Sequence, residues 1–233
     1  MVSVSHKNQQ KIWNQEHAHP FVLKQMDSSD PSSGITRFLE FLKNTVGSVS
    51  GLKGIELGCG KGRNVIWLSK KGISMTGIDF SVTAIKEAKK RADYAHAAST
   101  LVVHDATTRW PFASNAFDIA IDCFATTDIE SEKGRQFAVN EMIRVVKPSG
   151  YILVYVMSTD DEFHKKMLKE SPADEKNAFI HPTNGKFEKI YDREEILLLY
   201  KRLKLVAEER LAKTAVFFGK KYACNHYWMI FKK

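Results

Sequence analysis

The sequence has few cysteines and no long apolar run, and these two absences exclude several classes of protein. Its three cysteines, Cys59, Cys123 and Cys224, lie far apart and form no C-x-x-C pair. A disulfide framework or a zinc ribbon is therefore excluded, and a reducing compartment is expected. No stretch approaches the ~18 uninterrupted apolar residues of a membrane helix, and residues 1–30 contain no signal-like apolar core. We therefore expect a cytoplasmic protein with no membrane partner.

Extremes of composition are absent as well. Of the 233 residues, 43% are hydrophobic and 27% are charged, which is typical of a globular protein. The length fits one α/β domain with additions, and there is no internal repeat or low-complexity tract. The formal net charge of +8 favours acidic partners or nucleic acid without requiring either.

Short apolar segments alternate with helical stretches from residue 54 onward. Five of them are predicted to be strands: Ile55–Leu57, Ile73–Ile78, Leu101–Val103, Phe117–Ile121 and Tyr151–Met157. Strands that alternate with helices predict a parallel sheet of the doubly wound, Rossmann-like α/β class. Two β-rich segments, around Leu205–Leu211 and Cys224–Phe231, are expected to add an antiparallel C-terminal pair joined through Gly219.

Four helices are predicted around these strands. One occupies residues 31–46, capped by Asp30, and one begins at Ser81. A third ends at the turn Lys147–Gly150, and a fourth begins at Asp192, which has capping-box spacing to Glu195.

Three segments are predicted in the domain organisation. Residues 1–30 show little periodicity, although Trp13 and the apolar run 21–23 suit an N-terminal flap. Residues 31–233 form one domain. Within it, residues 158–190 are charged, interrupted by prolines and without sustained periodicity, which indicates a lid or cap insertion.

The most informative segment is Gly54–Asn64, where a strand runs into three alternating glycines and then a helix. Glycines permit positive φ in a tight turn and remove the Cβ atoms that would block a ligand, while the helix start leaves N–H donors free. Asp79 stands 21 positions after Gly58, at the end of the next strand. That separation is typical of a carboxylate that accepts ribose hydroxyls.

The glycine spacing separates two cofactor classes. Dinucleotide sites use G-x-G-x-x-G, whereas this chain has G-x-G-x-G with Arg63 at the place of the third glycine of that fingerprint. Glu56 precedes the loop, and a carboxylate there repels a pyrophosphate but suits an amino group or a sulfonium cation.

The run Ile55–Gly62 resembles motif I of the class I S-adenosylmethionine-dependent methyltransferases. Residues 110–121 and 144–151 resemble later segments of the compact type-11 or tellurite-resistance-like members, which act on small molecules. The resemblance implies the seven-stranded fold of that family and S-adenosylmethionine as cofactor. It covers roughly residues 50–233.

The resemblance also implies residue roles. Glu56 and the loop of Gly58, Cys59, Gly60 and Gly62 are expected to hold the methionine end of the cofactor. Asp79 is expected at the ribose hydroxyls, Phe80 at the adenine face, and Asp105 with Ala106 at the adenine amino edge. Asp122 and Phe124 are expected to border the amino group and the reactive methyl.

Methyl transfer mainly requires alignment of a nucleophile with an already activated carbon, so no metal is expected and a general base is optional. Five candidate bases remain open, each with a structural role as the alternative: His17, His19, His181, Tyr155 and Tyr191. No catalytic residue is assigned, and the sequence indicates no oligomeric state.

The expected acceptor is a small molecule with a nucleophilic O, N or S atom. An RNA acceptor is the alternative, because residues 186–233 contain twelve lysines and arginines against six acids, with aromatic residues between them. Two nucleic-acid classes are disfavoured: the Asn/Asp-Pro-Pro-aromatic motif is absent after the fourth strand, and Cys123 lacks the neighbouring proline of cytosine-C5 enzymes. A non-catalytic cofactor-binding domain is a further alternative.

Overall fold

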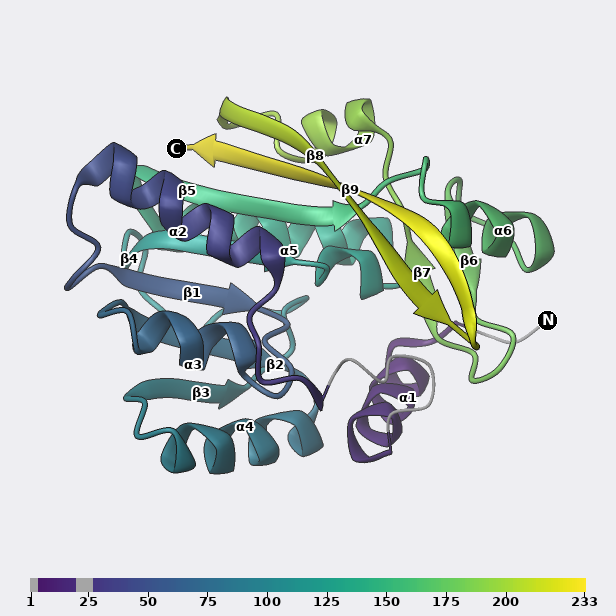
Figure 1. The fold of residues 1–233 in the computed structure, drawn as a ribbon, viewed down its shortest axis with the longest axis horizontal. Helices are drawn as coiled ribbons and strands as arrows, with labels where there is room; N and C mark the ends of the chain where they lie inside the picture. Colours follow the sequence, from purple (N-terminus) through teal and green to yellow (C-terminus); the bar gives the residue numbers. More distant parts are fainter. Residues whose placement is uncertain (1–3, 20–26) are drawn as a thin grey trace.

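The computed structural model describes residues 4–19 and 27–233, and a seven-stranded sheet organises them (Figure 1). The strand order is β3-β2-β1-β4-β5-β9-β8. The strands are β1 (Lys53–Leu57), β2 (Ser74–Asp79), β3 (Ser99–Val103), β4 (Phe117–Cys123), β5 (Val146–Met157), β8 (Lys204–Phe217) and β9 (Lys220–Lys232). Strands β1 to β5 pair in parallel, and β9 runs antiparallel to both of its neighbours. The predicted fold class is thereby confirmed.

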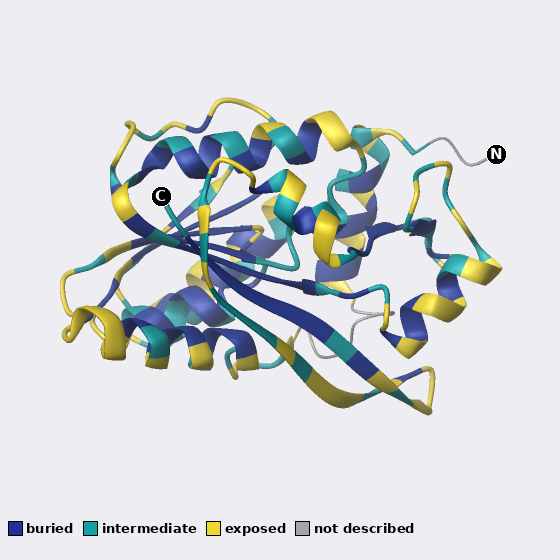
Figure 2. Cartoon of the chain, turned by 90° about the horizontal axis from the view of Figure 1, so that it is seen from above, coloured by how far each residue is buried: buried dark blue, intermediate teal, exposed yellow. Residues whose placement is uncertain are grey.

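Helices cover both faces of the sheet. On one face pack α2 (Ser33–Val46), α3 (Arg63–Ser69) and α4 (Val82–Tyr94), and on the other pack α5 (Glu132–Val145) and α7 (Arg193–Leu199). Each central strand alternates its side chains between the two apolar clusters, so that Ile119 and Ala120 of β4, for example, belong to different faces. Figure 2 shows the result, with the central strands buried and the outer helix faces exposed.

The structure confirms most predicted helix ends and corrects two. Ser81 caps α4, and Asp192 with Glu195 forms the expected capping box of α7. The N-cap of α2 is Ser32, so the prediction of Asp30 as cap is wrong. The helix before Pro148 ends at Val145, and β5 begins at once, with the Lys147–Gly150 turn forming an irregularity inside the strand.

The C-terminal hairpin is longer than its apolar pattern predicted. Strands β8 and β9 pair from Lys204↔Lys232 to Phe217↔Lys220, and Gly219 has a φ of 78° in the tight connection. The far half of the hairpin projects beyond the parallel strands (Figure 1). There it packs against α6 (Glu162–Glu170). The ring of Phe163, on α6, stacks on the ring of Phe217, on β8, at a centroid distance of 4.0 Å.

Two segments have more regular structure than their sequences indicated. Residues 158–190 contain α6 and a short hairpin of β6 (Ala178–Ile180) and β7 (Phe187–Lys189). The first segment contains α1 (His6–Ala18), which buries Ile12 and Trp13; the predicted contribution of residues 21–23 lies outside the described residues. No helix in residues 4–19 or 27–233 is long and apolar enough to cross a membrane.

A buried ion cluster ties α6 to β7. His164 Nδ1 lies 2.5 Å from Asp161 Oδ1, and its Nε2 lies 3.6 Å from Glu188 Oε2. Burial disfavours the charged imidazole, but the two carboxylates outweigh it and raise the pKa of His164 to about 9. The cation therefore holds two elements of the insertion together.

This cluster predicts a pH-dependent stability. Because the pKa of folded His164 lies above the unfolded value of 6.5, its contribution is complete below pH 6.5 and is lost as the pH rises through about 9. We expect His164→Gln to lower the free energy of unfolding by about 2–3 kcal/mol at pH 6 and by clearly less at pH 10. Urea denaturation at both pH values measures this, with exposed His19→Gln as control. An equal loss at both pH values contradicts the ion cluster.

Candidate functional site

A cavity of about 700 Å³ opens at the carboxyl edge of the parallel strands. The loop after β1 and the ends of β2, β3 and β4 form one half of its wall. The other half is formed by α1, α6, the β6–β7 hairpin and the far half of the β8–β9 hairpin. The cavity therefore lies between β1 and β4, where the connections after the two strands run in opposite directions. This is the usual ligand position in doubly wound sheets.

The three glycines after β1 all adopt positive φ, with values of 60° at Gly58, 53° at Gly60 and 79° at Gly62. Glycine adopts this backbone conformation without strain, whereas residues that carry a Cβ atom are strained in it. A Cβ atom on Gly58 would lie 2.7 Å from the Ala125 Cβ atom, so the loops after β1 and β4 touch at this point.

Glu56 lies buried beneath this loop with half of its carboxylate unpaired. Asn64 Nδ2 donates to Oε1 at 2.6 Å, whereas Oε2 has no hydrogen-bond partner among the described residues. Burial raises the pKa of Glu56 to about 8, and the Asn64 hydrogen bond only partly opposes this. An unpaired buried carboxylate oxygen is costly, so this site favours a cationic hydrogen-bond donor.

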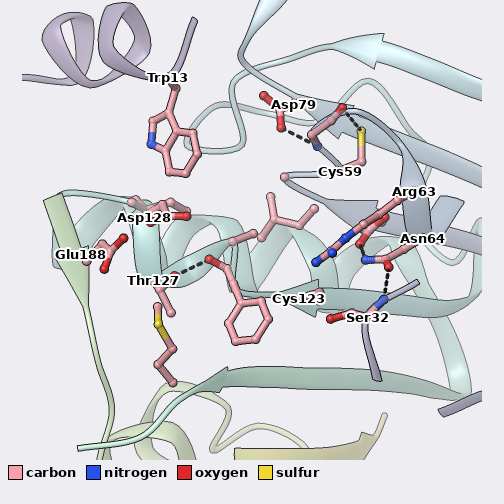
Figure 3. Close-up of a pocket in the computed structure, with 18 of the residues that line it drawn as sticks. Trp13, Ser32, Cys59, Arg63, Asn64, Asp79, Cys123, Thr127, Asp128 and Glu188 are labelled. Atoms are coloured by element: carbon pink, nitrogen blue, oxygen red, sulfur yellow. Dashed lines mark hydrogen bonds between the residues drawn. The ribbon is translucent and has the colours of Figure 1, made fainter. Parts of the chain in front are cut away.

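Asp79 connects the ends of β1 and β2. Its Oδ2 accepts from Gly60 N at 2.9 Å (Figure 3). Its Oδ1 accepts from Ser81 N at 2.8 Å. Burial raises the pKa of Asp79 to about 6, although both N–H donors lower it. The carboxylate still has lone pairs for further donors in the cavity, because an ionised carboxylate accepts about four hydrogen bonds.

Helix α1 covers the end of the cavity nearest β2 and β3. His6 Nε2 lies 2.9 Å from Asp105 Oδ2, and the His6 ring lies 5.7 Å from the Phe80 ring. Gln10 Nε2 also donates to the Phe80 carbonyl oxygen at 3.0 Å. The N-terminal segment thus contacts two residues that the sequence assigned to the adenine.

The cavity wall contains nine of the eleven residues predicted at the cofactor: Glu56, Gly58, Cys59, Gly60, Asp79, Phe80, Asp105, Ala106 and Phe124. Gly62 lies behind the wall, where it caps α3 close to Ala88.

Asp122 is placed differently from the prediction. Its side chain is fully buried behind the wall and accepts hydrogen bonds from Ala125 N, Thr126 N, Thr126 Oγ1 and Tyr200 Oη. These bonds shape the turn after β4, which presents Phe124 to the cavity with a φ of 65°. Asp122 is therefore a positioning residue for that turn.

Two of the five candidate bases lie in the cavity wall, His17 and His181. Burial is the main cause that lowers the pKa of His17 to about 4, and burial also lowers the pKa of His181. The other three lie elsewhere: Tyr155 bonds Ser33 and His226, Tyr191 bonds the Thr126 carbonyl oxygen, and His19 is exposed.

Sequence reasoning missed several polar residues of the second half of the wall. These are Asp128, His164, Lys186, Glu188, Lys213 and His226. None follows a recognisable motif, because the helices and hairpins that carry them come together only in the tertiary structure. The one available signal was the high charge of residues 158–190.

A family model described as "Methyltransferase domain" matches residues 55–150, the segment that forms the β1–β5 half of this cavity. Residues 55–150 therefore resemble the methyltransferase domain of the class I S-adenosylmethionine-dependent family. The sheet of this chain also matches that of an S-adenosylmethionine-dependent methyltransferase structure from Methanosarcina mazei. That match has a TM-score of 0.70 and 21% identity over 81% of this chain and 96% of that chain.

Curated relatives match over shorter regions. A demethylmenaquinone methyltransferase from Renibacterium salmoninarum is 26% identical over 66% of this chain and 53% of its own length. A tRNA (carboxymethyluridine(34)-5-O)-methyltransferase from Xenopus tropicalis is 31% identical over 50% of this chain and 18% of its own length. The chain therefore spans about half or less of the length of these two relatives.

The contact between the two loops predicts a specific sensitivity of Gly58. We expect Gly58→Ala to lower the free energy of unfolding by about 2–4 kcal/mol, since it adds a clash with Ala125 to the strain of positive φ. Gly219→Ala is the matched control: its φ of 78° is equally strained, but no atom lies within 4 Å of the added Cβ. Chemical denaturation that shows equal losses for both variants contradicts the close approach.

Proposed function

We propose that this methyltransferase transfers a methyl group from S-adenosylmethionine to a nucleophilic O, N or S atom of a small molecule. The observation that carries the proposal is the unpaired Oε2 of buried Glu56 beneath the glycine loop. S-adenosylmethionine presents a cationic amino group to such a carboxylate, and its sulfonium supplies an activated methyl carbon.

The wall residues suit each part of that cofactor. Glu56 and the backbone of Gly58 and Gly60 would hold the methionine end. The Asp79 carboxylate would accept the ribose hydroxyls at the end of β2, as in other nucleotide sites of doubly wound sheets. Phe80 would pack on the adenine, with Asp105 and Ala106 at its amino edge.

The enclosure of the cavity supports a small acceptor. Helix α1 and the β6–β7 hairpin meet over it: Gln9 Nε2 donates to the Gly185 carbonyl oxygen at 3.0 Å, and Gln9 Oε1 accepts from Phe187 N at 2.9 Å. Residues 1–30 as a flap and 158–190 as a cap are consistent with these contacts. A site covered on this side limits the access of water to the reacting atoms and selects acceptors by size.

RNA methylation is the second candidate, favoured by the likeness to the tRNA methyltransferase and by the basic C-terminal region. The contacts of that region weigh against it. Phe217, Tyr227, Trp228 and Phe231 are buried, which leaves them unavailable for base stacking. Arg193 and Arg210 form ion pairs with Glu208 and Asp160.

Calorimetry with S-adenosylhomocysteine and with NAD tests the cofactor class. We expect binding of the sulfur ligand and none of NAD; the reverse result refutes the proposal. We also expect Asp79→Asn to weaken S-adenosylhomocysteine binding by about 1–3 kcal/mol, because one oxygen that accepts hydrogen bonds is lost. Exposed Asp93→Asn, on α4, is the control and should bind normally.

Glu56 predicts proton release on binding. Its pKa of about 8 keeps it mostly protonated at pH 6.5, where the amino group of the ligand is charged. An ionic contact therefore requires Glu56 to lose about one proton, and the affinity should increase as the pH rises from 6 to 8. Calorimetry in two buffers of different ionisation enthalpy counts the protons. Glu56→Gln should abolish the proton release. If proton release persists in that variant, the proton comes from another group.

A further inference from the structure

Asp128 is an acidic side chain at the second end of the cavity, and no side-chain hydrogen bond is formed by its carboxylate among the described residues. It ends the short 3₁₀ helix η2 (Thr126–Asp128), directly after the turn that touches the glycine loop. Figure 3 shows it at one end of the cavity with Trp13 and Glu188, opposite Asn64 and Arg63. Its side chain is half-buried and lines the cavity.

The charged neighbours of Asp128 are already paired with one another. Lys186 Nζ contacts Glu188 Oε1 and lies 4.8 Å from the centre of the Trp13 ring. Asp161 holds the protonated His164. Lys186 lies close enough to act on the charge of Asp128, but its ion pair is with Glu188.

The charges around this end balance only when Asp128 is neutral. The other acids are Glu16, Asp161 and Glu188, and the cations are His164, Lys186 and Lys213, the last of them exposed at the rim. Burial lowers the pKa values of the three remaining histidines, His17, His181 and His226, so these are uncharged.

Ionised Asp128 therefore adds one negative charge, and the cation that acts on it, Lys186, is already paired with Glu188. Burial raises the pKa of Asp128 well above its usual range, and Lys186 only partly opposes this effect. A single cationic ligand would balance the charge and favour the ionised carboxylate. An anionic ligand at this end would meet the carboxylates of Asp128 and Glu188, while Lys186 is already paired with Glu188.

Aromatic rings in the lining of the same cavity suit the same ligand. Trp13 lies on one side, and the stacked pair Phe163 and Phe217 lines the cavity on the hairpin side. Phe124 lies on the side of the glycine loop. Ring faces attract organic cations and pack against the apolar part of an amine.

We propose that the acceptor is a small amine, bound as its ammonium ion against the Asp128 carboxylate, and that Asp128 sets this selectivity. The inference rests on the proposed methyltransferase function and narrows its acceptor atom to nitrogen. It separates this chain from relatives named for quinone or RNA acceptors.

The same carboxylate accounts for the proton that the reaction must remove. The ammonium nitrogen loses one proton to Asp128, which frees its lone pair. That lone pair forms the bond to the methyl carbon, while the electrons of the broken carbon–sulfur bond stay on sulfur. Asp128 then returns the proton to water, so one proton is released for each methyl group transferred.

Three probes of similar shape test the selectivity: 2-phenylethylamine, 2-phenylethanol and phenylacetate. Each is titrated into the full chain by calorimetry and by ligand-observed NMR, with and without S-adenosylhomocysteine. We expect the amine to bind roughly tenfold more tightly than the alcohol and the carboxylate to bind most weakly. Equal affinities, or a preference for the alcohol or the carboxylate, overturn the inference.

Variants then assign the preference to Asp128. Asp128→Asn should abolish the preference for the amine, whereas Asp128→Glu should retain most of it. Asp174→Asn, at an exposed site in the same insertion, is the matched control and should leave it unchanged. Thermal unfolding and S-adenosylhomocysteine affinity of each variant report folding. An amine preference that survives in folded Asp128→Asn refutes the role of this carboxylate.

The two proposals fail separately. If S-adenosylhomocysteine binds but the amine shows no preference, the acceptor class is wrong and the proposed function stands. If the amine preference depends on Asp128 but no sulfur ligand binds, the amine site exists in a protein whose proposed function is wrong.

Discussion

The access of the buried Glu56 carboxylate to the cavity depends on one constraint: the chain leaves β1 and β4 in opposite directions. Because β1 leads through α3 to β2 on one side and β4 leads through α5 to β5 on the other, no crossover covers the edge between them. The glycine loop and the turn after β4 meet there, with Gly58 against Ala125. This geometry leaves the Glu56 oxygen facing a cavity in place of a packed core.

A second layer of structure converts that open edge into an enclosed site. Helix α1 bonds Phe80 and Asp105 at one end and the β6–β7 hairpin at the other. The far half of the β8–β9 hairpin and α6 complete the wall through the stacked rings of Phe163 and Phe217. These elements contribute ionisable groups that are buried in pairs, so each pair can be removed from water at a tolerable cost. Asp128 remains outside this pairing and is the residue that we propose selects a cationic acceptor.

The basic character of the chain has a structural explanation in the same elements. Several C-terminal cations contact carboxylates or rings: Arg193 pairs with Glu208, and the Arg210 guanidinium lies 3.9 Å from the centre of the Tyr227 ring. Strand β8 is a sheet edge, where charged side chains disfavour pairing with another chain. The positive charge is thus compatible with a small-molecule enzyme.

Local sequence patterns determined the parallel sheet, the glycine loop and the half of the site built on β1 to β4. Apolar periodicity identifies strands and crossover helices, and the glycine spacing with Glu56 and Asp79 depends only on short-range chain geometry. The roles of Asp122 and Asp128 could not be read in this way. Asp122 lies near the end of β4 and Asp128 follows the strand closely, yet Asp122 turns inward to Tyr200, whereas Asp128 lies with Glu188 at one end of the cavity. Only the tertiary structure decided this, because Tyr200, which bonds Asp122, and Lys186 and Glu188, which act on Asp128, lie more than fifty residues away along the chain.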